Sequence, residues 1–154
     1  MWFDGCVVMT DQILFYRVGD EYGEFSNFAP YPIRVDGKRW PTTEHYFQAQ
    51  KFLAAEHQLA IRKAKGPMRA AKMGRDRKRP LRRDWERVKD DVMYRALRAK
   101  FTQHEELRAL LLGTGEAKLI EHTRNDRYWA DGGDDSGKNM LGVLLMRLRR
   151  ELSR

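Results

Sequence analysis

Residues 31–52 read YPIRVDGKRWPTTEHYFQAQKF, and this stretch passes from an extended pattern to a helical one. Asp36-Gly37 lies between two short extended runs, which is typical of a tight β-hairpin turn. Pro41-Thr42 then opens a helical pattern, and Thr42 is a suitable N-cap for a helix over Thr43–Phe52. A hairpin followed directly by a helix predicts a protein of the α+β class.

The rest of the chain adds several helices and few strands. Apolar residues recur at intervals of three and four in most segments, and glycine often follows where the pattern stops. We expect an extended run at 13–16, a loop at 25–28 and a strand at Lys118–Glu121. We expect one helix that ends near Lys65, a short helix over Met68–Met73 that ends before Gly74, and a long helix that is capped by Asp84 and reaches Phe101. Two further helices are expected over Glu105–Leu112 and Met140–Leu152. The predicted fold is α+β and predominantly helical, one domain over residues 1–154 with helices packed around a small β-sheet or hairpin.

The composition excludes several classes of protein. The chain has 154 residues, of which 42% are hydrophobic and 11% aromatic, so it is too apolar for a disordered protein. Its single cysteine, Cys6, excludes an intramolecular disulfide framework, and we expect it to be a small core residue. No apolar run approaches the roughly 18 residues of a membrane span, and the first residues, MWFDGCVVMTD, lack the basic flank of a signal peptide. We expect a cytoplasmic protein without a membrane partner.

The net charge of +8 is concentrated in one segment, residues 62–89. This basic block has thirteen bases against three acids, so it carries the whole positive excess. Such a block favours binding of phosphates, on a nucleic acid or on a nucleotide. The alternative is a solvated helical face in a basic protein. The thirteen bases are Arg62, Lys63, Lys65, Arg69, Lys72, Arg75, Arg77, Lys78, Arg79, Arg82, Arg83, Arg87 and Lys89.

The helix predicted over Thr43–Phe52 has an unusual face. At about 100° per residue, Glu44, Phe47, Gln48 and Lys51 share one side of it, so a carboxylate, an amide and an amine lie beside an aromatic ring. An amphipathic surface helix normally keeps its charges away from its aromatic residues. Two readings are open at this point: Glu44 and Lys51 flank a bound substrate, or the face is solvated and carries a simple i, i+4 hydrogen-bonding pair.

A second candidate region is the polar segment at 125–139, NDRYWADGGDDSGKN. A long loop rich in Asp, Trp and Gly is more often functional than idle in a compact domain. Its aspartates do not have the spacing of an EF-hand, and the four histidines have no zinc spacing. We therefore expect no metal and no cofactor.

Six motifs occur in order along the chain: FSNF at 25–28, WPTTEHYFQAQKF, AAKMGR, RRDWERVKDDVMYRALRAKF, LLGTGEAKLIEHTRNDRYWADGG and GKNMLGVLLMRLR. Together with the Asp-Gly hairpin, they resemble the NADAR / YbiA-like family from about Ile13 to Leu152. The sequence departs from the family pattern at Ala130, where glycine is usual, and at Thr43, where valine is common. The resemblance implies a hydrolase that cleaves N-glycosidic bonds to ribose.

Two substrate classes are associated with that family. One is ADP-ribose on the amino group of guanine in DNA, which such proteins remove as antitoxins, with a cognate ADP-ribosyltransferase toxin as a partner. The other is the phosphoribosylamino-pyrimidine intermediates of riboflavin biosynthesis. The basic block favours the first class, because thirteen bases suit a polyanion better than a metabolite with one phosphate. A non-catalytic module that binds ADP-ribose or nucleic acid is a third reading.

The resemblance also implies which residues form the site. Family active-site positions match Glu44 and Lys51 in the EHYFQAQKF segment, Trp85, and Asp126 with Trp129 in DRYW. The two tryptophans are candidates for stacking on a base, with ordinary core packing as the alternative. The full set of expected substrate-binding residues is Ser26, Asn27, Phe28, Gln48, Arg75, Arg82, Trp85, Trp129, Asp131 and Asn139.

Two chemical routes are open for these residues. In the first, Glu44 and Asp126 divide the work: one carboxyl group assists the leaving amine, and the other activates water or stabilises the positive charge on the ribose. In the second, Lys51 captures the anomeric carbon of the opened sugar as a Schiff base. The sequence does not choose between them.

Overall fold

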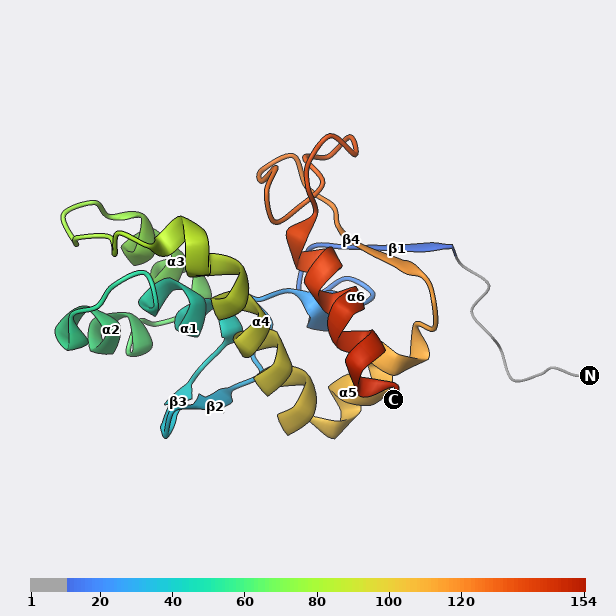
Figure 1. The fold of residues 1–154 in the computed structure, drawn as a ribbon, viewed down its shortest axis with the longest axis horizontal. Coiled ribbons are helices and arrows are strands. Elements are labelled where there is room, and N and C mark those ends of the chain that lie inside the picture. Colours follow the sequence, from blue (N-terminus) through green and yellow to red (C-terminus); the bar gives the residue numbers. More distant parts are fainter. Residues whose placement is uncertain (1–10) are drawn as a thin grey trace, which may run out of the picture.

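A computed structural model describes residues 11–154 and confirms a predominantly helical α+β fold (Figure 1). Cys6, which the sequence predicts as a core residue, lies outside the described residues. The elements in chain order are β1 (Gln12–Phe15), the short 3-10 helix η1 (Gly23–Phe25), β2 (Ile33–Val35), β3 (Lys38–Trp40), α1 (Thr43–Ala49), α2 (Ala55–Arg62), α3 (Pro67–Arg75), α4 (Trp85–Gln103), α5 (Glu105–Gly113), β4 (Lys118–Glu121) and α6 (Met140–Leu152).

The strands form two small sheets. β2 and β3 pair antiparallel through Asp36 and Gly37, which have φ angles of 53° and 77°, so the predicted hairpin turn is confirmed. β1 and β4 pair in parallel although they are far apart in sequence, with Ile13 opposite Leu119. This pairing fixes the position of β4, from which the loop to α6 begins.

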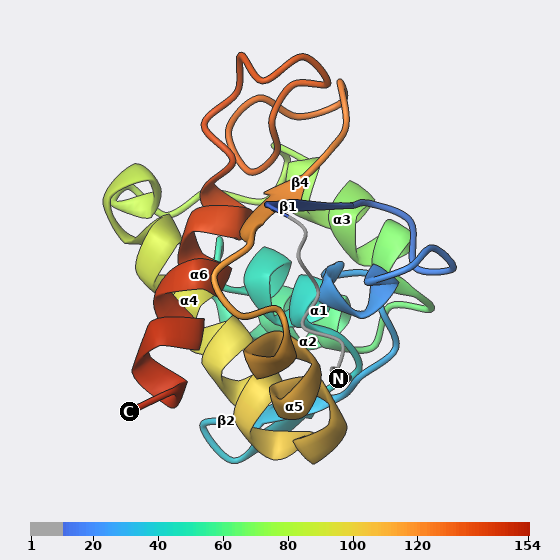
Figure 2. The ribbon, with the colours of Figure 1, turned by 90° about the vertical axis from the view of Figure 1, so that its right-hand side faces the viewer.

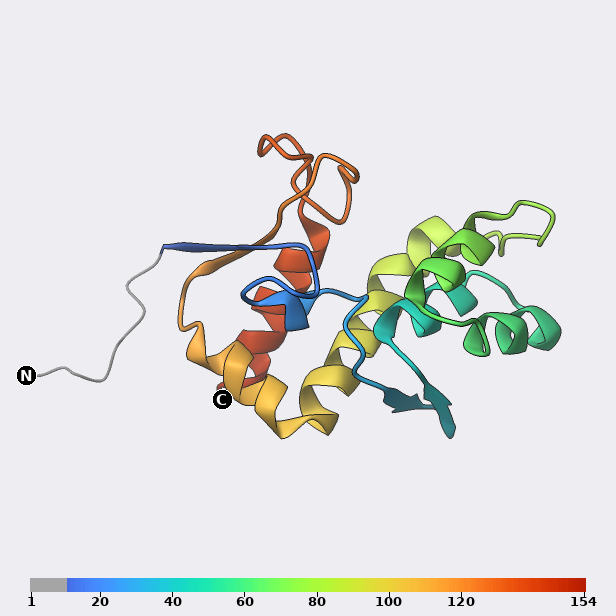
Figure 3. The same ribbon diagram turned by 180° about the vertical axis from the view of Figure 1, so that it is seen from behind.

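Helix α4 is the central element of the core. It lies between the group formed by α1, α2 and α3 and the group formed by α5, α6 and the β1–β4 sheet (Figures 1 and 3). Its buried face includes Met93, Leu97 and Phe101, and α6 runs beside it with Leu141, Leu145 and other leucines turned inward (Figure 2). In Figure 2 the loop between β4 and α6 lies at the top of the molecule, above the N-terminal end of α6. Within residues 11–154, no helix is both long and apolar enough to cross a membrane.

The predicted extent of the first helix is wrong at its C-terminal end. Thr42 caps α1 as expected, because its side chain accepts the backbone N–H of His45. The helix ends at Ala49, however, and Lys51 lies in the turn that follows rather than on the helical face with Glu44. The carbonyl of Lys51 accepts the backbone N–H of Arg82 at 2.9 Å, so a distant segment holds this turn in place of a further helical residue.

One other predicted helix end changes, and one predicted helix cap does not form. Gly74 does not end the helix predicted at 68–73, because α3 continues through it to Arg75. A Cβ atom at Gly74 would lie 1.9 Å from Oε1 of Gln48, so the glycine permits the close packing of α3 on α1. Asp84 precedes α4 as predicted, but its side chain bonds Arg82 and caps no helical N–H.

Candidate active site

Glu44 lies in the first turn of α1, and its side chain is only 8% exposed. One carboxylate oxygen, Oε2, accepts a hydrogen bond from Nε2 of Gln48 at 2.7 Å. The backbone N–H of Glu44 donates to the carbonyl of Asn27, so the 25–28 loop fixes the start of the helix. The carboxyl group is therefore held rigidly by two segments that the sequence identified separately.

The surroundings of Glu44 raise the pKa of its carboxyl group. Burial is the main cause, and the nearby carboxylate of Asp126 adds to it. The hydrogen bond from Gln48 and the positive charges of Lys51 and Arg75 oppose the rise. The structure thus brings Glu44, Asp126, Lys51 and Arg75 within electrostatic reach of one another, and a carboxyl group with a raised pKa is suited to donate a proton.

Lys51 is also perturbed by this environment. Burial, followed by the positive charge of Arg77 and, more weakly, of Arg75, lowers the pKa of the Lys51 amine to about 8, against the opposing effect of Glu44. Its Nζ lies 5.8 Å from the centre of the Phe47 ring. An amine with such a pKa is partly neutral near pH 8, which is the form required of a nucleophile.

The loop at 25–28 contacts the start of α1, where Glu44 lies. Ser26 and Asn27 are buried, and Nζ of Lys100 donates to the Ser26 carbonyl at 2.9 Å. Oδ1 of Asn27 accepts from the hydroxyl of Thr43 at 2.8 Å, a bond that the valine common in the family could not form. Phe28 is partly exposed beside them.

Three aromatic rings form one wall next to Glu44. Phe47 of α1 contacts Trp85 and Trp129 edge to face, with ring centres 5.2 and 5.3 Å away. Trp85 is 5% exposed and belongs to the core cluster, so core packing accounts for its ring. Trp129 is only partly buried, and stacking of its ring on a base stays a prediction.

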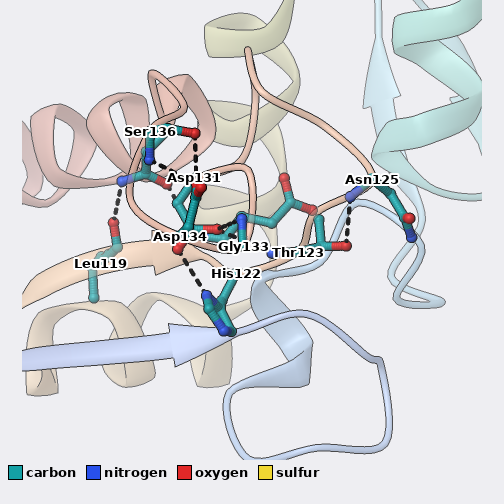
Figure 4. A network of polar contacts seen from close by, with 10 residues as sticks. Leu119, His122, Thr123, Asn125, Asp131, Gly133, Asp134 and Ser136 are labelled. Carbon is teal, nitrogen blue, oxygen red and sulfur yellow. Dashed lines mark hydrogen bonds and ion pairs between the residues drawn. The ribbon is translucent and has the colours of Figure 1, made fainter.

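The loop between β4 and α6 is held by its own polar groups (Figure 4). Asp131 is buried, and its carboxylate accepts the backbone N–H groups of Thr123 and Gly133 and pairs with Nδ1 of His122 at 2.7 Å. Asn139 has a φ of 53°, and its side chain bonds the backbone of Leu119 and Glu121. The structure therefore places Asp131 and Asn139, both predicted to bind substrate, in the internal framework of the loop.

Asp126, Arg82 and Arg75 differ in which protein groups their side chains bond. Oδ1 of Asp126 accepts the backbone N–H groups of Tyr128 and Trp129 at 2.8 and 2.7 Å, which fixes the carboxylate at the loop edge. Arg82 is paired with Asp84 at 2.6 Å and also bonds the Gln50 carbonyl, so it fixes the turn beside Lys51. Arg75 is exposed and has no carboxylate within 4.0 Å among residues 11–154.

Glu121, at the end of β4, is the site residue that the sequence reasoning missed. Burial raises the pKa of its carboxyl group to about 8, and Asp126, Glu44 and Asp131 add to the rise through their negative charge. A charged residue at the end of a strand predicted to be buried was the available signal. Glu121 thus joins the acidic groups around Glu44. Residues 11–154 nevertheless contain no cluster of three His, Cys, Asp or Glu side chains arranged to hold a metal ion.

The raised pKa of Glu121 predicts a pH-dependent stability. Between pH 5 and 7 the native carboxyl keeps its proton while the unfolded one, with an ordinary pKa of 4.5, loses it, so the native state binds more protons and loses stability as pH rises. We expect Glu121→Gln to remove roughly 2 kcal/mol of this decline over that range. Urea unfolding of both proteins at pH 5 and pH 7 measures the difference. An identical pH dependence in the two proteins would contradict the assignment.

Comparisons with known proteins agree with the resemblance. The model of the NADAR domain family matches residues 14–153. N-glycosidase YbiA of Escherichia coli (strain K12) is 63% identical over 147 residues, which cover 95% of this chain and 92% of that protein. The riboflavin biosynthesis protein PYRR, chloroplastic, of Zea mays is 40% identical over 158 residues, covering 93% of this chain and 25% of that protein.

The fold is shared with a solved structure as well. The NMR structure of the E. coli protein YbiA is similar to it with a TM-score of 0.88 at 63% identity, covering 95% of this chain and 88% of that one. Family match, sequence identity and fold agree over nearly the same residues. The chain belongs to the NADAR domain family.

Proposed function

We propose that this protein removes ADP-ribose from the amino group of guanine in DNA by hydrolysing the N-glycosyl bond. The enzyme class, a hydrolase acting on N-glycosyl bonds, follows from family membership and from relatives named N-glycosidase. The observation that carries the chemistry is the buried Glu44 carboxyl group, held by Gln48 and within electrostatic reach of Asp126, Lys51 and Arg75. A binding module would not need a buried acid in this position.

The bond-breaking step can be assigned to the two carboxyl groups. As the bond between ribose C1 and the amino nitrogen breaks, its electron pair goes to the nitrogen, and positive charge develops on the sugar. Glu44, whose pKa is raised, gives its proton to the leaving nitrogen, and the Asp126 carboxylate stabilises the charge at C1. Water then adds to C1, and its proton returns to the carboxyl pair, leaving free ADP-ribose and unmodified guanine.

Lys51 provides a second route to the same products. When the sugar ring opens, C1 is joined to the guanine amino nitrogen as an imine. The Lys51 amine, with a pKa of about 8, can attack this C1, and the bond from C1 to the guanine nitrogen then breaks, its electron pair and a proton going to that nitrogen. Water hydrolyses the remaining lysine imine and releases ADP-ribose and the free amine. On either route we expect Lys51→Met to lower kcat by about 100-fold, because it removes either the nucleophile or the cation that faces Glu44. Turnover rates on a modified oligonucleotide measure the loss, and wild-type turnover would exclude any role for Lys51.

Borohydride trapping separates the two routes, because it reduces an imine to a stable amine. An adduct on Lys51, found by intact-protein mass spectrometry, assigns the covalent route. Lys51→Arg keeps the positive charge but cannot form the imine. If this variant retains turnover, and the wild-type protein gives no adduct with borohydride, water attacks C1 directly.

The choice of DNA as the substrate rests on the basic block. Arg82, Arg87 and Lys89 pair with carboxylates, whereas the other ten bases have none within 4.0 Å among the described residues. Nine bases of the block are exposed. This concentration of free positive charge beside the site suits a polyanion.

A second candidate function is hydrolysis of phosphoribosylamino-pyrimidine intermediates of riboflavin biosynthesis. It is favoured by the name of the Zea mays relative, which aligns with 93% of this chain. The test offers the purified protein an oligonucleotide with ADP-ribosylated guanine and a phosphoribosylamino pyrimidine in parallel. Release of ADP-ribose from the oligonucleotide at the higher kcat/KM supports the proposal, a preference for the pyrimidine supports the second candidate, and inertness toward both supports a binding module.

A further inference from the structure

A hollow of about 630 Å³ lies between α2 and α3, outside the site around Glu44. Four cationic side chains line it, and Met68 and Met73 form an apolar part of its surface. None of its lining residues is acidic. We call this hollow the α2–α3 groove and define it by Lys63, Lys65, Arg69, Lys72, Met68 and Met73.

The four cations of the groove are available to a ligand. All are exposed, and none has a carboxylate within 4.0 Å among residues 11–154. Like charges gathered around one hollow repel each other, so the arrangement does not stabilise the fold by itself. It creates a positive potential that an anionic ligand with several charges would relieve.

The groove leads toward the catalytic carboxyl group. Arg69, Lys72 and Arg75 follow at intervals of three along α3, which spaces them about 4.5 Å apart along the helix axis. The last of them is near enough to Glu44 to influence its pKa. α3 also packs closely on α1 at Gly74, where it meets Gln48. A line of positive charge therefore runs from the groove to the site.

The pyrophosphate of ADP-ribose does not require these groove residues. Lys51 and Arg75 already lie within electrostatic reach of Glu44, Arg77 lies within reach of Lys51, and two or three cations are enough for one pyrophosphate group. The groove begins farther along α3 and adds four more cations. Its exposed methionine, Met68, is 53% accessible and offers an apolar surface between the charges.

We propose that the α2–α3 groove binds the backbone phosphates of the DNA strand that carries the modified guanine. This inference rests on the proposed function and adds to it the path of the strand. The groove cations hold phosphates next to the modified nucleotide while the ribose bond lies at Glu44. On this proposal the groove contacts the flanking phosphates rather than the ADP-ribose group, so a modified nucleoside without flanking phosphates gains nothing from it.

The test compares two quadruple variants with equal loss of charge. The groove variant carries Lys63→Gln, Lys65→Gln, Arg69→Gln and Lys72→Gln. The matched control carries Arg108→Gln, Lys118→Gln, Arg150→Gln and Arg154→Gln, all exposed and all remote from α2 and α3 (Figure 1). Each protein is assayed on a single-stranded oligonucleotide with one ADP-ribosylated guanine and on ADP-ribosylated guanosine.

We expect the groove variant to lose about 30-fold or more in kcat/KM on the oligonucleotide and less than about 3-fold on the nucleoside. The slope of log kcat/KM against log salt concentration should become shallower by about 2–3, since each lost phosphate contact on a single strand contributes about 0.7. The control variant should stay near wild type on both substrates. Equal losses on both substrates, or equal losses in the two variants, would overturn the proposal.

A binding measurement keeps this inference separate from the proposed function. A fluorescently labelled, unmodified single strand is titrated with each protein and followed by anisotropy. If the wild-type protein hydrolyses neither substrate, the proposed function fails, but weaker binding by the groove variant alone still supports the groove as a strand-binding surface. The same affinity in both variants, or preferential binding of polyglutamate over the strand, would assign the groove otherwise and overturn the inference.

Discussion

Replacing Glu44 by glutamine is expected to lower kcat by about 1000-fold or more while the protein stays folded. The side chain is 8% exposed, so the substitution removes a proton donor without exposing or opening the core. The new amide oxygen can still accept the hydrogen bond from Gln48 that Oε2 of Glu44 accepts at 2.7 Å. Because burial raises the pKa of Glu44, a neutral amide also avoids the cost of a buried charge, and we expect the thermal midpoint to stay or to rise.

Single-turnover release of ADP-ribose from a modified oligonucleotide measures the loss in the Glu44→Gln protein. Glu56→Gln, an exposed glutamate in the first turn of α2, serves as the matched control and should turn over at the wild-type rate. The assignment of Glu44 as the acid also predicts that wild-type activity falls as pH rises through its raised pKa. A Glu44→Gln protein with turnover within about threefold of wild type would show that this carboxyl group does no chemistry.

The second large effect is expected from a single methyl group at Gly74. In Gly74→Ala the new Cβ would lie 1.9 Å from Oε1 and 2.7 Å from Cδ of Gln48, so the amide must leave its position. Glu44 then loses the hydrogen bond that lowers its pKa, and that pKa rises further. We expect a loss of about 30-fold in kcat, a loss of roughly 1–3 kcal/mol in unfolding free energy, and an alkaline limb of the pH–rate profile at higher pH.

A matched glycine and a double-mutant cycle test this explanation. Gly113→Ala places a Cβ where no atom lies within 4 Å, and we expect it to leave rate and stability near wild type. In a Gln48→Ala background the contacts with Oε1 and Cδ are gone and only the Cβ of residue 48, at 3.1 Å, remains close, so Gly74→Ala should add much less loss in either quantity than it causes alone. Fully additive effects of the two substitutions would show that Gly74 acts through some contact other than Gln48.

The elements that the sequence predicts well are those with local causes. The hairpin at Asp36-Gly37 needs two adjacent residues with positive φ, and the Thr42 cap needs one hydroxyl beside one N–H. The predicted strand Lys118–Glu121 and helix Met140–Leu152 match β4 and α6 at both ends. Each pattern is contained in the segment that forms the element.

The early end of α1 and the role of Gly74, which the sequence does not predict, depend on segments far apart in the chain. Helix α1 stops early because Arg82 bonds the carbonyl of Lys51, and Gly74 matters because α3 lies on Gln48. No periodicity in one segment encodes either contact.

The same limit applies within the candidate site. The family motifs predict Glu44, Asp126 and Lys51 together, and the structure places the three within electrostatic reach of each other. The carboxyl group of Glu121 joins them only because β4 pairs with β1 and delivers it there. Asp131, Asn139 and Arg82 remain predicted substrate-binding residues, and the three-dimensional arrangement adds that each also bonds nearby protein groups.

The bond between ribose C1 and the amino nitrogen of guanine is the bond that we propose this protein breaks. The most direct test incubates the purified protein with one oligonucleotide carrying a single ADP-ribosylated guanine and weighs both products by mass spectrometry. We predict equal amounts of free ADP-ribose and of the fully unmodified oligonucleotide, with neither formed by the Glu44→Gln protein. An oligonucleotide that keeps a phosphoribosyl group, or one that returns unchanged, would contradict this account.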